Sequence, residues 1–445
     1  MTEARLDGLL LLLLGCSVFL VMGAVLGRAT SGPKKAASRT DVPRAKMRYG
    51  FADQAIAIVS GLSFVLVGVT VCTIPFTNSI SGARDFVVYW ATGQQLAQHA
   101  NPYDKAALMR IESAAGLSVN SSVGYMRNPP WALPLTLPLG LAGLRVGGFL
   151  WSMALLASLL VSVYWLWQLY GRPSNQRHWL GAAFAPAVIC LLIGQTSLFA
   201  LLGYVLFLRL HRSRPFWAGM SLWLCALKPH LFLAIGVVLL AWVLVSRSYR
   251  VLAGAAVAVA VSCLVAYWID PAAWTQYAAM MRESGINQEA IPCISIVVRQ
   301  WLSPKTMWLQ YVPAILGCGW SLSYFWQRRR TWDWIKDGSL VTLVSVLVAP
   351  YSWITDQVLA IPALLEGAIL TRSQILLVIL AAASIVLEAE LLGGVILASN
   401  LYLWTAPAWL AWYLLARRSA SKPSIDTKSS YVIMDSDPRS GSQPR

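Results

Sequence analysis

Apolar stretches of about 20 residues, the length that crosses a lipid bilayer, recur along nearly the whole chain. Examples are Leu9 to Leu26, Ala55 to Ile74, Phe149 to Leu169, Val251 to Ile269 and Leu397 to Leu415. Other apolar stretches are shorter and end at a polar or proline break, which indicates helix pairs joined by tight turns. In lipid every backbone N–H and C=O needs an internal partner, so such a chain is predicted to fold as an all-α membrane bundle.

The composition supports a polytopic membrane protein and argues against several other classes. Of the 445 residues, 57% are hydrophobic and 12% are charged, whereas roughly a quarter of the residues of a soluble protein carry charge. The net charge of +16 comes from short basic clusters between apolar stretches and not from a polar domain, so we expect no nucleic-acid partner. The 7 cysteines are scattered without Cys-x-x-Cys spacing, and the histidines are scattered too. We therefore expect no disulfide framework, metal site or cofactor.

The basic clusters predict which loops face the cytoplasm, because such loops carry an excess of Lys and Arg. The clusters are Arg28 to Arg48, Arg172 to Arg177, Arg209 to Arg214, Arg247 to Arg250, Arg328 to Lys336 and Arg417 to Lys428. Two clusters on the same side must be separated by an even number of crossings. This parity predicts five segments outside: the loop that begins near Asp85, the polar loop from Asp270 to about Lys305, and the junctions Gly194 to Thr196, Lys228 to His230 and Tyr351 to Gln357.

One segment conflicts with this parity. The passage from an external loop near Asn128 to an internal Arg172 needs an odd number of crossings, whereas Trp131 to Tyr170 resembles two apolar stretches. Trp131 to Gly143 is short and contains two prolines, so it either crosses the membrane or dips into it without crossing. The sequence leaves both alternatives open.

The chain divides into three parts by composition. We expect residues 1–50 to form an accessory N-terminal span and a basic cytoplasmic linker, and residues 51–416 to form the main transmembrane domain with an external loop at 76–130. Residues 417–445 are rich in Ser, Lys, Asp and Pro, and we expect a disordered cytoplasmic tail.

The external loop is predicted to contain short amphipathic helices that lie flat on the membrane surface. Tyr89, Trp90 and Leu96 recur at helical spacing with glutamines opposite, and Asn101 to Asp104 predicts a turn followed by an N-cap. Aromatic residues at this depth are typical of the interfacial belt, which is one explanation for Tyr89.

Asp85 is the candidate catalytic residue because it lies where an apolar stretch ends and the loop begins. A carboxylate at this boundary can keep its charge and still reach a hydroxyl group of a substrate and a donor whose tail stays in the bilayer. The alternative is an ion pair at a helix end with Arg84 or Arg110.

Other polar residues at the predicted external junctions are candidates for substrate binding. Lys228 is costly inside an apolar stretch, so it either binds the donor phosphate or extends to the interface beside Pro229. His230 could donate to the same phosphate or be an interfacial histidine. Gln195 could bind sugar hydroxyl groups or cap two helices.

Three further candidates complete the set. Asp356 is a second carboxylate at an external junction, where it could bind a substrate hydroxyl or act as an N-cap. Arg127 and Arg299 lie in predicted external segments and could meet a phosphate, although charged residues are common at such rims.

The order of these motifs resembles a known family. It combines Asp85-Phe86 with Tyr89, Ala91, Gln94-Gln95-Leu96, Asn101-Pro102-Tyr103-Asp104, Pro129-Pro130, Pro138-Leu139, Gly194-Gln195, Ala218-Gly219, Lys228-Pro229, Pro350, Ser352-Trp353 and Pro362. Over roughly residues 54 to 416 the chain resembles the polyprenol-phosphate-mannose-dependent alpha-mannosyltransferases, which belong to the GT-C superfamily and include the enzymes that extend mycobacterial phosphatidylinositol mannosides. It departs from many relatives at Trp353-Ile354-Thr355-Asp356-Gln357, where a His pair is absent, and this leaves the donor in doubt.

The resemblance implies a GT-C bundle of about 11–13 spans in the cell membrane, with its active site on the external face. It also implies that Asp85 acts as general base while a polyprenyl-phosphate donor passes a hexosyl group, in the family a mannosyl group, to a lipid-linked or glycan acceptor with inversion. The competing hypothesis is a transporter or flippase of lipid-linked saccharides, which Glu366, Glu388 and Glu390 within apolar stretches keep open.

Overall fold

A computed structural model describes residues 84–116, 126–283, 291–392 and 399–421, together with part of residues 53–69. The predicted N-terminal span, its linker and nearly all of the predicted tail lie outside the described residues. The N-terminal half contains the helices α3 (Arg84–Ala97), α4 (Lys105–Ala114), η2 (Pro130–Leu135), α5 (Leu137–Ala142), α6 (Leu144–Leu169), η3 (Gln176–Gly181), α7 (Ala185–Ile193), α8 (Ser197–Leu210), α9 (Pro215–Cys225), η4 (Pro229–Phe232) and α10 (Leu233–Ser246). The C-terminal half contains α11 (Tyr249–Ile269), α12 (Ala273–Glu283), α13 (Ile294–Leu302), η6 (Met307–Tyr311), α14 (Val312–Arg328), α15 (Gly338–Leu347), η7 (Ile354–Ala360), α16 (Ile361–Leu370), α17 (Gln374–Leu392), η8 (Asn400–Tyr402) and α18 (Thr405–Ser421).

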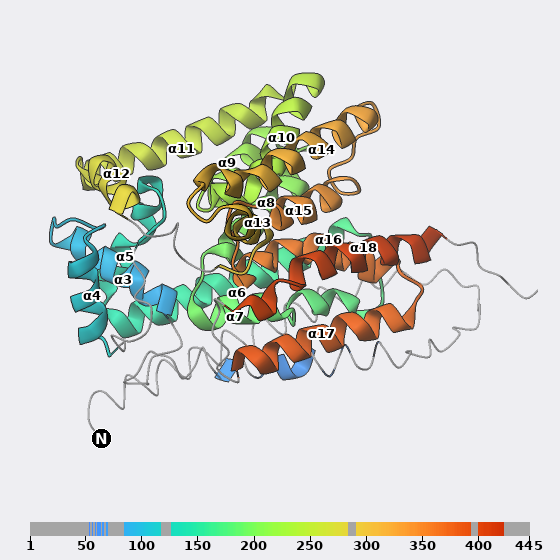
Figure 1. The fold of residues 1–445 in the computed structure, drawn as a ribbon, viewed down its shortest axis with the longest axis horizontal. Helices are drawn as coiled ribbons and strands as arrows, with labels where there is room; N and C mark the ends of the chain where they lie inside the picture. Colours follow the sequence, from blue (N-terminus) through green and yellow to red (C-terminus); the bar gives the residue numbers. More distant parts are fainter. Residues whose placement is uncertain are drawn as a thin grey trace, which may run out of the picture.

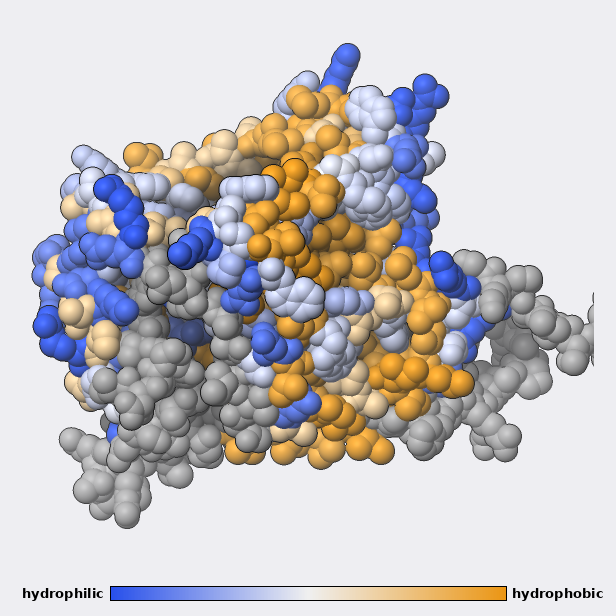
Figure 2. Space-filling view, viewed as in Figure 1, coloured by the Kyte–Doolittle hydropathy of each residue, from blue (hydrophilic) through white to orange (hydrophobic). Residues whose placement is uncertain are grey.

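The predicted all-α membrane bundle is confirmed, since the described residues form helices and no strand. The long helices α6, α11, α17 and α18 run across the view of Figure 1, while α3, α4, α5 and α12 gather at its left end. Figure 2 shows an apolar band across the middle of the visible face, with hydrophilic residues at both sides. Within the described part, three helices are long and apolar enough to cross a membrane: Leu144–Leu169, Pro229–Ser246 and Tyr249–Ile269. The predicted number of spans stays a prediction.

Several basic clusters of the sequence meet at one end of the bundle, which we call the basic end. Arg212 pairs with Asp333 at 3.2 Å, which joins the clusters around residues 209–214 and 328–336. Arg177 Nη1 donates to the carbonyl oxygens of Ala368 and Thr371, both at 3.0 Å. The Thr371 hydroxyl lies 2.5 Å from that of Ser419, next to the cluster that begins at Arg417. Clusters far apart in sequence therefore share one surface.

The predicted helix pairs are present, and their breaks meet at the opposite end, which we call the site end. Helix α7 ends at Ile193, and α8 begins at Ser197 after the turn Gly194 to Thr196. Lys228 separates α9 from η4, and η7 separates α15 from α16. Gly194 adopts φ 81°, a left-handed conformation suited to glycine, and its backbone lies against Phe86 of α3 so closely that a Cβ would overlap with that residue.

The segment that conflicted with the predicted parity forms two short helices that stay at the site end. Helices η2 and α5 together are at most about 20 Å long at 1.5 Å per residue, less than the ~30 Å hydrocarbon core. Trp131 of η2 donates its indole N–H to Ala226 O at 2.8 Å, and Ser262 of α11 donates to Trp131 O at 2.6 Å. Of the helices between residues 130 and 170, only α6 is long and apolar enough to cross a membrane, which agrees with the odd number of crossings that the sequence predicts.

Helix α3 is buried, and the prediction that it lies flat on the membrane surface is wrong. Its predicted polar face packs against protein: Gln95 is buried, and Gln94 Nε2 donates to Gly140 O at 2.7 Å. Gly93 of α3 and Gly140 of α5 meet backbone to backbone, so that a Cβ on either would overlap with the other helix. Small residues at this crossing let the helices approach closely, which hydropathy spacing alone does not report. The next predicted feature is confirmed, because Asp104 caps α4 by accepting from Ala106 N and Ala107 N.

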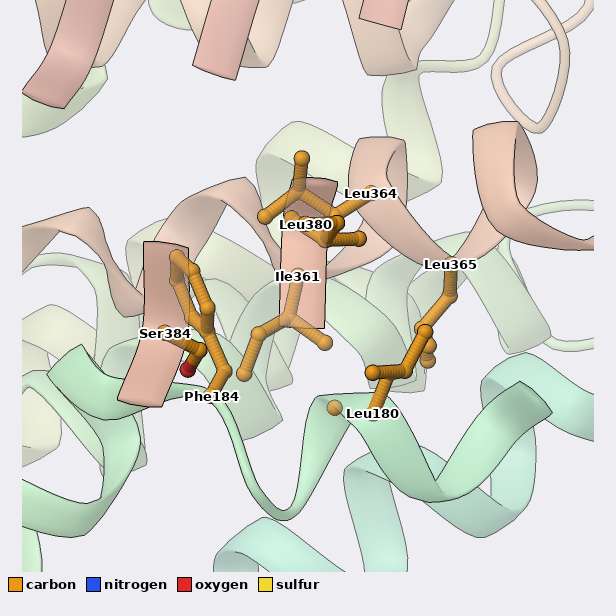
Figure 3. A pocket seen from close by; sticks show the side chains of 8 residues that line it. Leu180, Phe184, Ile361, Leu364, Leu365, Leu380 and Ser384 are labelled. Atoms are coloured by element: carbon orange, nitrogen blue, oxygen red, sulfur yellow. The ribbon is translucent and has the colours of Figure 1, made fainter. Parts of the chain in front are cut away.

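A small apolar cavity lies away from these junctions. Figure 3 shows Leu180, Phe184, Ile361, Leu364, Leu365, Leu380 and Ser384 around it. Its volume is about 10 Å³, room for about one water molecule. Its polar side chain, Ser384, already donates to Ala183 O and accepts from Ala185 N. The cavity is a packing defect between η3, α16 and α17.

Candidate active site

Asp85 lies in the first turn of α3 and is held by Gln195 from the turn between α7 and α8. Gln195 Nε2 donates to Asp85 Oδ2 at 2.6 Å. Gln195 Oε1 accepts from Thr196 N at 2.9 Å and from the Tyr89 hydroxyl at 3.1 Å. Because donors occupy the amide oxygen, the amide nitrogen is the atom that faces the carboxylate. The turn therefore fixes the orientation of the Asp85 side chain.

Aromatic contacts hold Tyr89, which bonds to Gln195, against neighbouring helices. The Tyr89 ring contacts Trp151 of α6, with ring centroids 5.3 Å apart, and Trp151 makes an edge-on contact with Phe199 of α8 at 5.0 Å. The Trp151 indole N–H donates to Gly194 O at 2.8 Å. Tyr89 is 6% exposed, so it packs inside the site and does not belong to an interfacial belt. The helix that carries Asp85 is thus joined to α6 and α8.

Lys228 and Asp356 form a buried ion pair beside this turn. Lys228 Nζ donates to Asp356 Oδ1 at 2.6 Å, and the side chains are 9% and 0% exposed, respectively. Asp356 Oδ1 also accepts from the Ser197 hydroxyl at 2.7 Å, and Oδ2 accepts from Trp353 N at 2.9 Å. Burial is the largest single influence and raises the pKa of the Asp356 carboxyl, but the Lys228 ammonium, His230 and the hydrogen bonds from Lys228 and Trp353 N together lower it, so the net pKa is lowered. The carboxylate is therefore charged, and Lys228 is held inside and does not extend to the interface.

Three consecutive residues connect the two carboxylates. Gln195 donates to Asp85 and Ser197 donates to Asp356, with Thr196 between them. Consecutive Cα atoms are about 3.8 Å apart, so the two donors start from points at most ~7.6 Å apart. A segment in the middle of the sequence thus joins the N-terminal loop to the C-terminal half.

His230 and Arg127 complete the surroundings. The His230 ring stacks on Tyr351, with centroids 3.8 Å apart and planes inclined by 22°, and His230 Nε2 is buried without a hydrogen-bond partner. Burial and, next, the charge of Asp356 raise the pKa of the Tyr351 hydroxyl, and the positive charge of Arg127 opposes them. Asn128, next in the chain, donates its side-chain N–H to Leu227 O at 3.0 Å. The loop is thereby attached beside Lys228.

The structure brings the seven sequence-predicted site residues into one region, although they span 272 positions of the chain. They are Asp85, Tyr89, Arg127, Gln195, Lys228, His230 and Asp356. For Gln195 and Asp356, the structural role that the sequence left open and a contact within the site are both present. Gln195 belongs to a turn between two helices and also contacts Asp85, and Asp356 closes the first turn of η7 and also pairs with Lys228. Their roles in substrate binding stay predictions.

Sequence reasoning missed three residues of this region. Ser197 is the first residue of an apolar helix, and nothing in its neighbourhood marks it as a carboxylate ligand. Trp151 resembles any tryptophan of a long apolar span. Tyr351 follows Pro350, which the family pattern contains, but its stacking on His230 depends on tertiary contacts. No group of three metal-ligating His, Cys, Asp or Glu side chains occurs in the part of the chain that the structure describes.

Comparison with known proteins gives one match. The model of glycosyltransferase family 87 matches residues 125–350, which is 226 of the 445 residues. No curated protein and no solved structure matches the chain. The matched segment contains Arg127, Gln195, Lys228 and His230, whereas the two carboxylates that they surround lie before and after it.

Proposed function

Because the chain belongs to glycosyltransferase family 87, we propose that it transfers a hexosyl group, mannosyl in the first instance, from a polyprenyl-phosphate donor to a lipid-linked or glycan acceptor. The observation that carries this proposal is the contact between Asp85 and Gln195 beside the buried Lys228–Asp356 pair. A carboxylate with a fixed orientation suits proton transfer from a substrate hydroxyl. The resemblance to polyprenol-phosphate-mannose-dependent enzymes supplies the donor class.

In the proposed reaction Asp85 acts as general base. The acceptor hydroxyl oxygen attacks the anomeric carbon of the donor sugar, and Asp85 takes the hydroxyl proton as that bond forms. The bond between the anomeric carbon and the phosphate oxygen breaks, and polyprenyl phosphate leaves with the electron pair. A single displacement of this kind inverts the configuration, so a beta-linked donor gives an alpha-linked product.

We assign the remaining site residues to positioning the substrates and the base. Lys228 is occupied by Asp356, so we assign it to holding that carboxylate, which in turn binds hydroxyl groups of the sugar. Tyr89 and Gln195 orient Asp85, and His230 and Arg127 contact the donor near Tyr351. The positive-inside rule favours a basic end that faces the cytoplasm, and this supports a site on the external face of the membrane.

A transporter or flippase explains the structure less well. The transporter hypothesis was supported by the carboxylates that lie within apolar stretches of the sequence. Glu366 accepts from the Tyr413 hydroxyl at 2.8 Å, and Glu388 accepts from the Ser63 hydroxyl at 3.2 Å. Each of these two carboxylates joins segments far apart in sequence, which favours a structural role, and family membership favours the transferase.

The proposal is tested by transfer in proteoliposomes with radiolabelled polyprenyl-phosphate mannose and candidate acceptors. We expect Asp85→Asn to lower the transfer rate by about 10²- to 10⁴-fold, because an amide cannot accept the proton. Asp104→Asn is the matched control: it makes the same change in the same loop and preserves the helix cap, so transfer stays at the wild-type rate. Unchanged transfer by Asp85→Asn would remove Asp85 as the base. Polyprenyl-phosphate glucose in place of the mannose donor tests the sugar.

A further inference from the structure

Arg299 of α13 is a buried charge with weak partners. It is 2% exposed, yet its side chain donates one hydrogen bond, from Nη1 to the Met307 thioether sulfur at 3.0 Å, and Nε has no hydrogen-bond partner among the residues that the structure describes. No described carboxylate forms an ion pair with it. A guanidinium is charged at every physiological pH, and a buried charge without a counter-ion is costly. The site therefore favours a negatively charged oxygen.

The position of α13 connects Arg299 to the proposed active site. Ile291, Cys293 and Ile296 form a cluster with Tyr351 and Trp353. The Ser295 hydroxyl donates to Val348 O at 3.2 Å, and Gln310 Nε2 donates to Pro350 O at 2.8 Å. These contacts hold the segment that contains Tyr351 and Trp353. Tyr351 stacks on His230, and the backbone N–H of Trp353 donates to Asp356.

Helices α13 and η6 also carry exposed apolar side chains. Trp301 and Leu302, at the end of α13, are 86% and 70% exposed, and Trp308 of η6 is 65% exposed. Exposed tryptophans on a short amphipathic helix are typical of the boundary between headgroups and hydrocarbon. Helix α13 therefore separates a lipid-facing surface from the residues around Tyr351.

Resting on the proposed function, we propose that Arg299 binds the phosphate of the polyprenyl-phosphate sugar donor, a phosphodiester that reaches the site from the bilayer along α13, and the polyprenyl phosphate monoester that leaves after transfer. A guanidinium matches two oxygens of one phosphate in a planar fork, which makes it the preferred partner for this group. Lys228 is already paired with Asp356, whereas Arg299 contacts, among the described side chains, the Met307 thioether and no carboxylate. A thioether is a weak acceptor on a flexible side chain, so a phosphate oxygen displaces Met307 readily.

Binding of farnesyl phosphate to the full-length protein in detergent tests this site without any need for transfer. We expect farnesyl phosphate to raise the melting temperature of the wild type, and farnesol, inorganic phosphate and phosphatidylglycerol to have little effect at the same concentration. Arg299→Gln weakens the farnesyl phosphate affinity by about 10- to 100-fold, and Arg299→Lys has an intermediate effect because it keeps the charge but not the fork. Arg282→Gln, an exposed arginine of α12 at the same end, binds as the wild type does.

Wild-type affinity in Arg299→Gln would overturn the proposal, and equal stabilisation by phosphatidylglycerol or inorganic phosphate would overturn the donor assignment. The melting temperature without ligand shows whether Arg299→Gln folds. If this variant does not fold, Arg299→Lys provides the test. We then expect the KM for the donor to rise while kcat stays near the wild-type value. The two proposals fail in different ways. Transfer by the wild type with normal binding by Arg299→Gln contradicts only the site. Binding that depends on Arg299, without transfer of any hexose, contradicts only the transferase mechanism.

Discussion

At the scale of single residues, the buried Lys228–Asp356 pair is the most demanding feature of the molecule. Removing two charges from water costs several kcal/mol per ion, and their attraction offsets this only when the geometry is good and further hydrogen bonds are present. Asp356 has both, with Ser197 and Trp353 N as additional donors. The sequence indicated the two residues separately, and their pairing across 128 positions was visible only in the structure.

This pair gives a stability prediction. Lys228→Met keeps the side-chain length but leaves the Asp356 carboxylate buried without a cation, so we expect a loss of about 3–5 kcal/mol in the free energy of unfolding. The double variant Lys228→Met with Asp356→Asn recovers part of that loss, because the amide carries no charge and its oxygen still accepts one of the two hydrogen bonds, from Ser197 or from Trp353 N. Denaturant unfolding in detergent measures both. A double variant less stable than Lys228→Met alone would contradict the role of the charge pair.

At the scale of helices, the crossing of α3 and α5 decides where Asp85 lies. Gly93 and Gly140 permit backbone contact between the two helices, and Gln94 adds a hydrogen bond to Gly140 O. The sequence predicted a helix here from the spacing of Tyr89, Trp90 and Leu96. It placed that helix on the membrane surface because polar glutamines usually face water, whereas here neighbouring helices supply packing and hydrogen bonds for Gln94 and Gln95.

The crossing is tested by one added methyl group. Gly140→Ala forces α3 away from α5, and we expect a destabilisation of about 1–3 kcal/mol, the usual cost of overpacking, together with slower transfer because Asp85 moves with α3. Gly236→Ala on α10 is the matched control, since a Cβ there meets nothing within 4 Å. Alanine is the better helix former by about 1 kcal/mol, so this control is at least as stable as the wild type. The test compares the melting temperature and the transfer rate of the two variants. Equal values in both would contradict the close contact between α3 and α5.

At the scale of the whole molecule, the separation of a basic end from a site end predicts orientation in the membrane. In a variant without the 7 native cysteines, we expect Ser113→Cys on α4 to react with a membrane-impermeant maleimide in intact cells. Arg330→Cys at the basic end reacts only after permeabilisation, because Lys and Arg clusters are retained in the cytoplasm. Both positions are exposed in the structure. Labelling with the opposite pattern would place Asp85 in the cytosol and end the proposed reaction with an external donor.

The sequence by itself determined the class of the protein and the chemical character of its junctions. Hydropathy predicted an all-α membrane bundle because lipid admits few other solutions, and the basic clusters predicted a shared basic end because charge resists burial. The tertiary structure decided which junctions touch and at which atoms. Gln195 contacts Asp85, Lys228 neutralises Asp356, and Arg299 contacts the Met307 thioether. These contacts join residues that lie 8 to 128 positions apart, and for the distant pairs the crossing of helices determines the geometry, which local spacing in the sequence does not record.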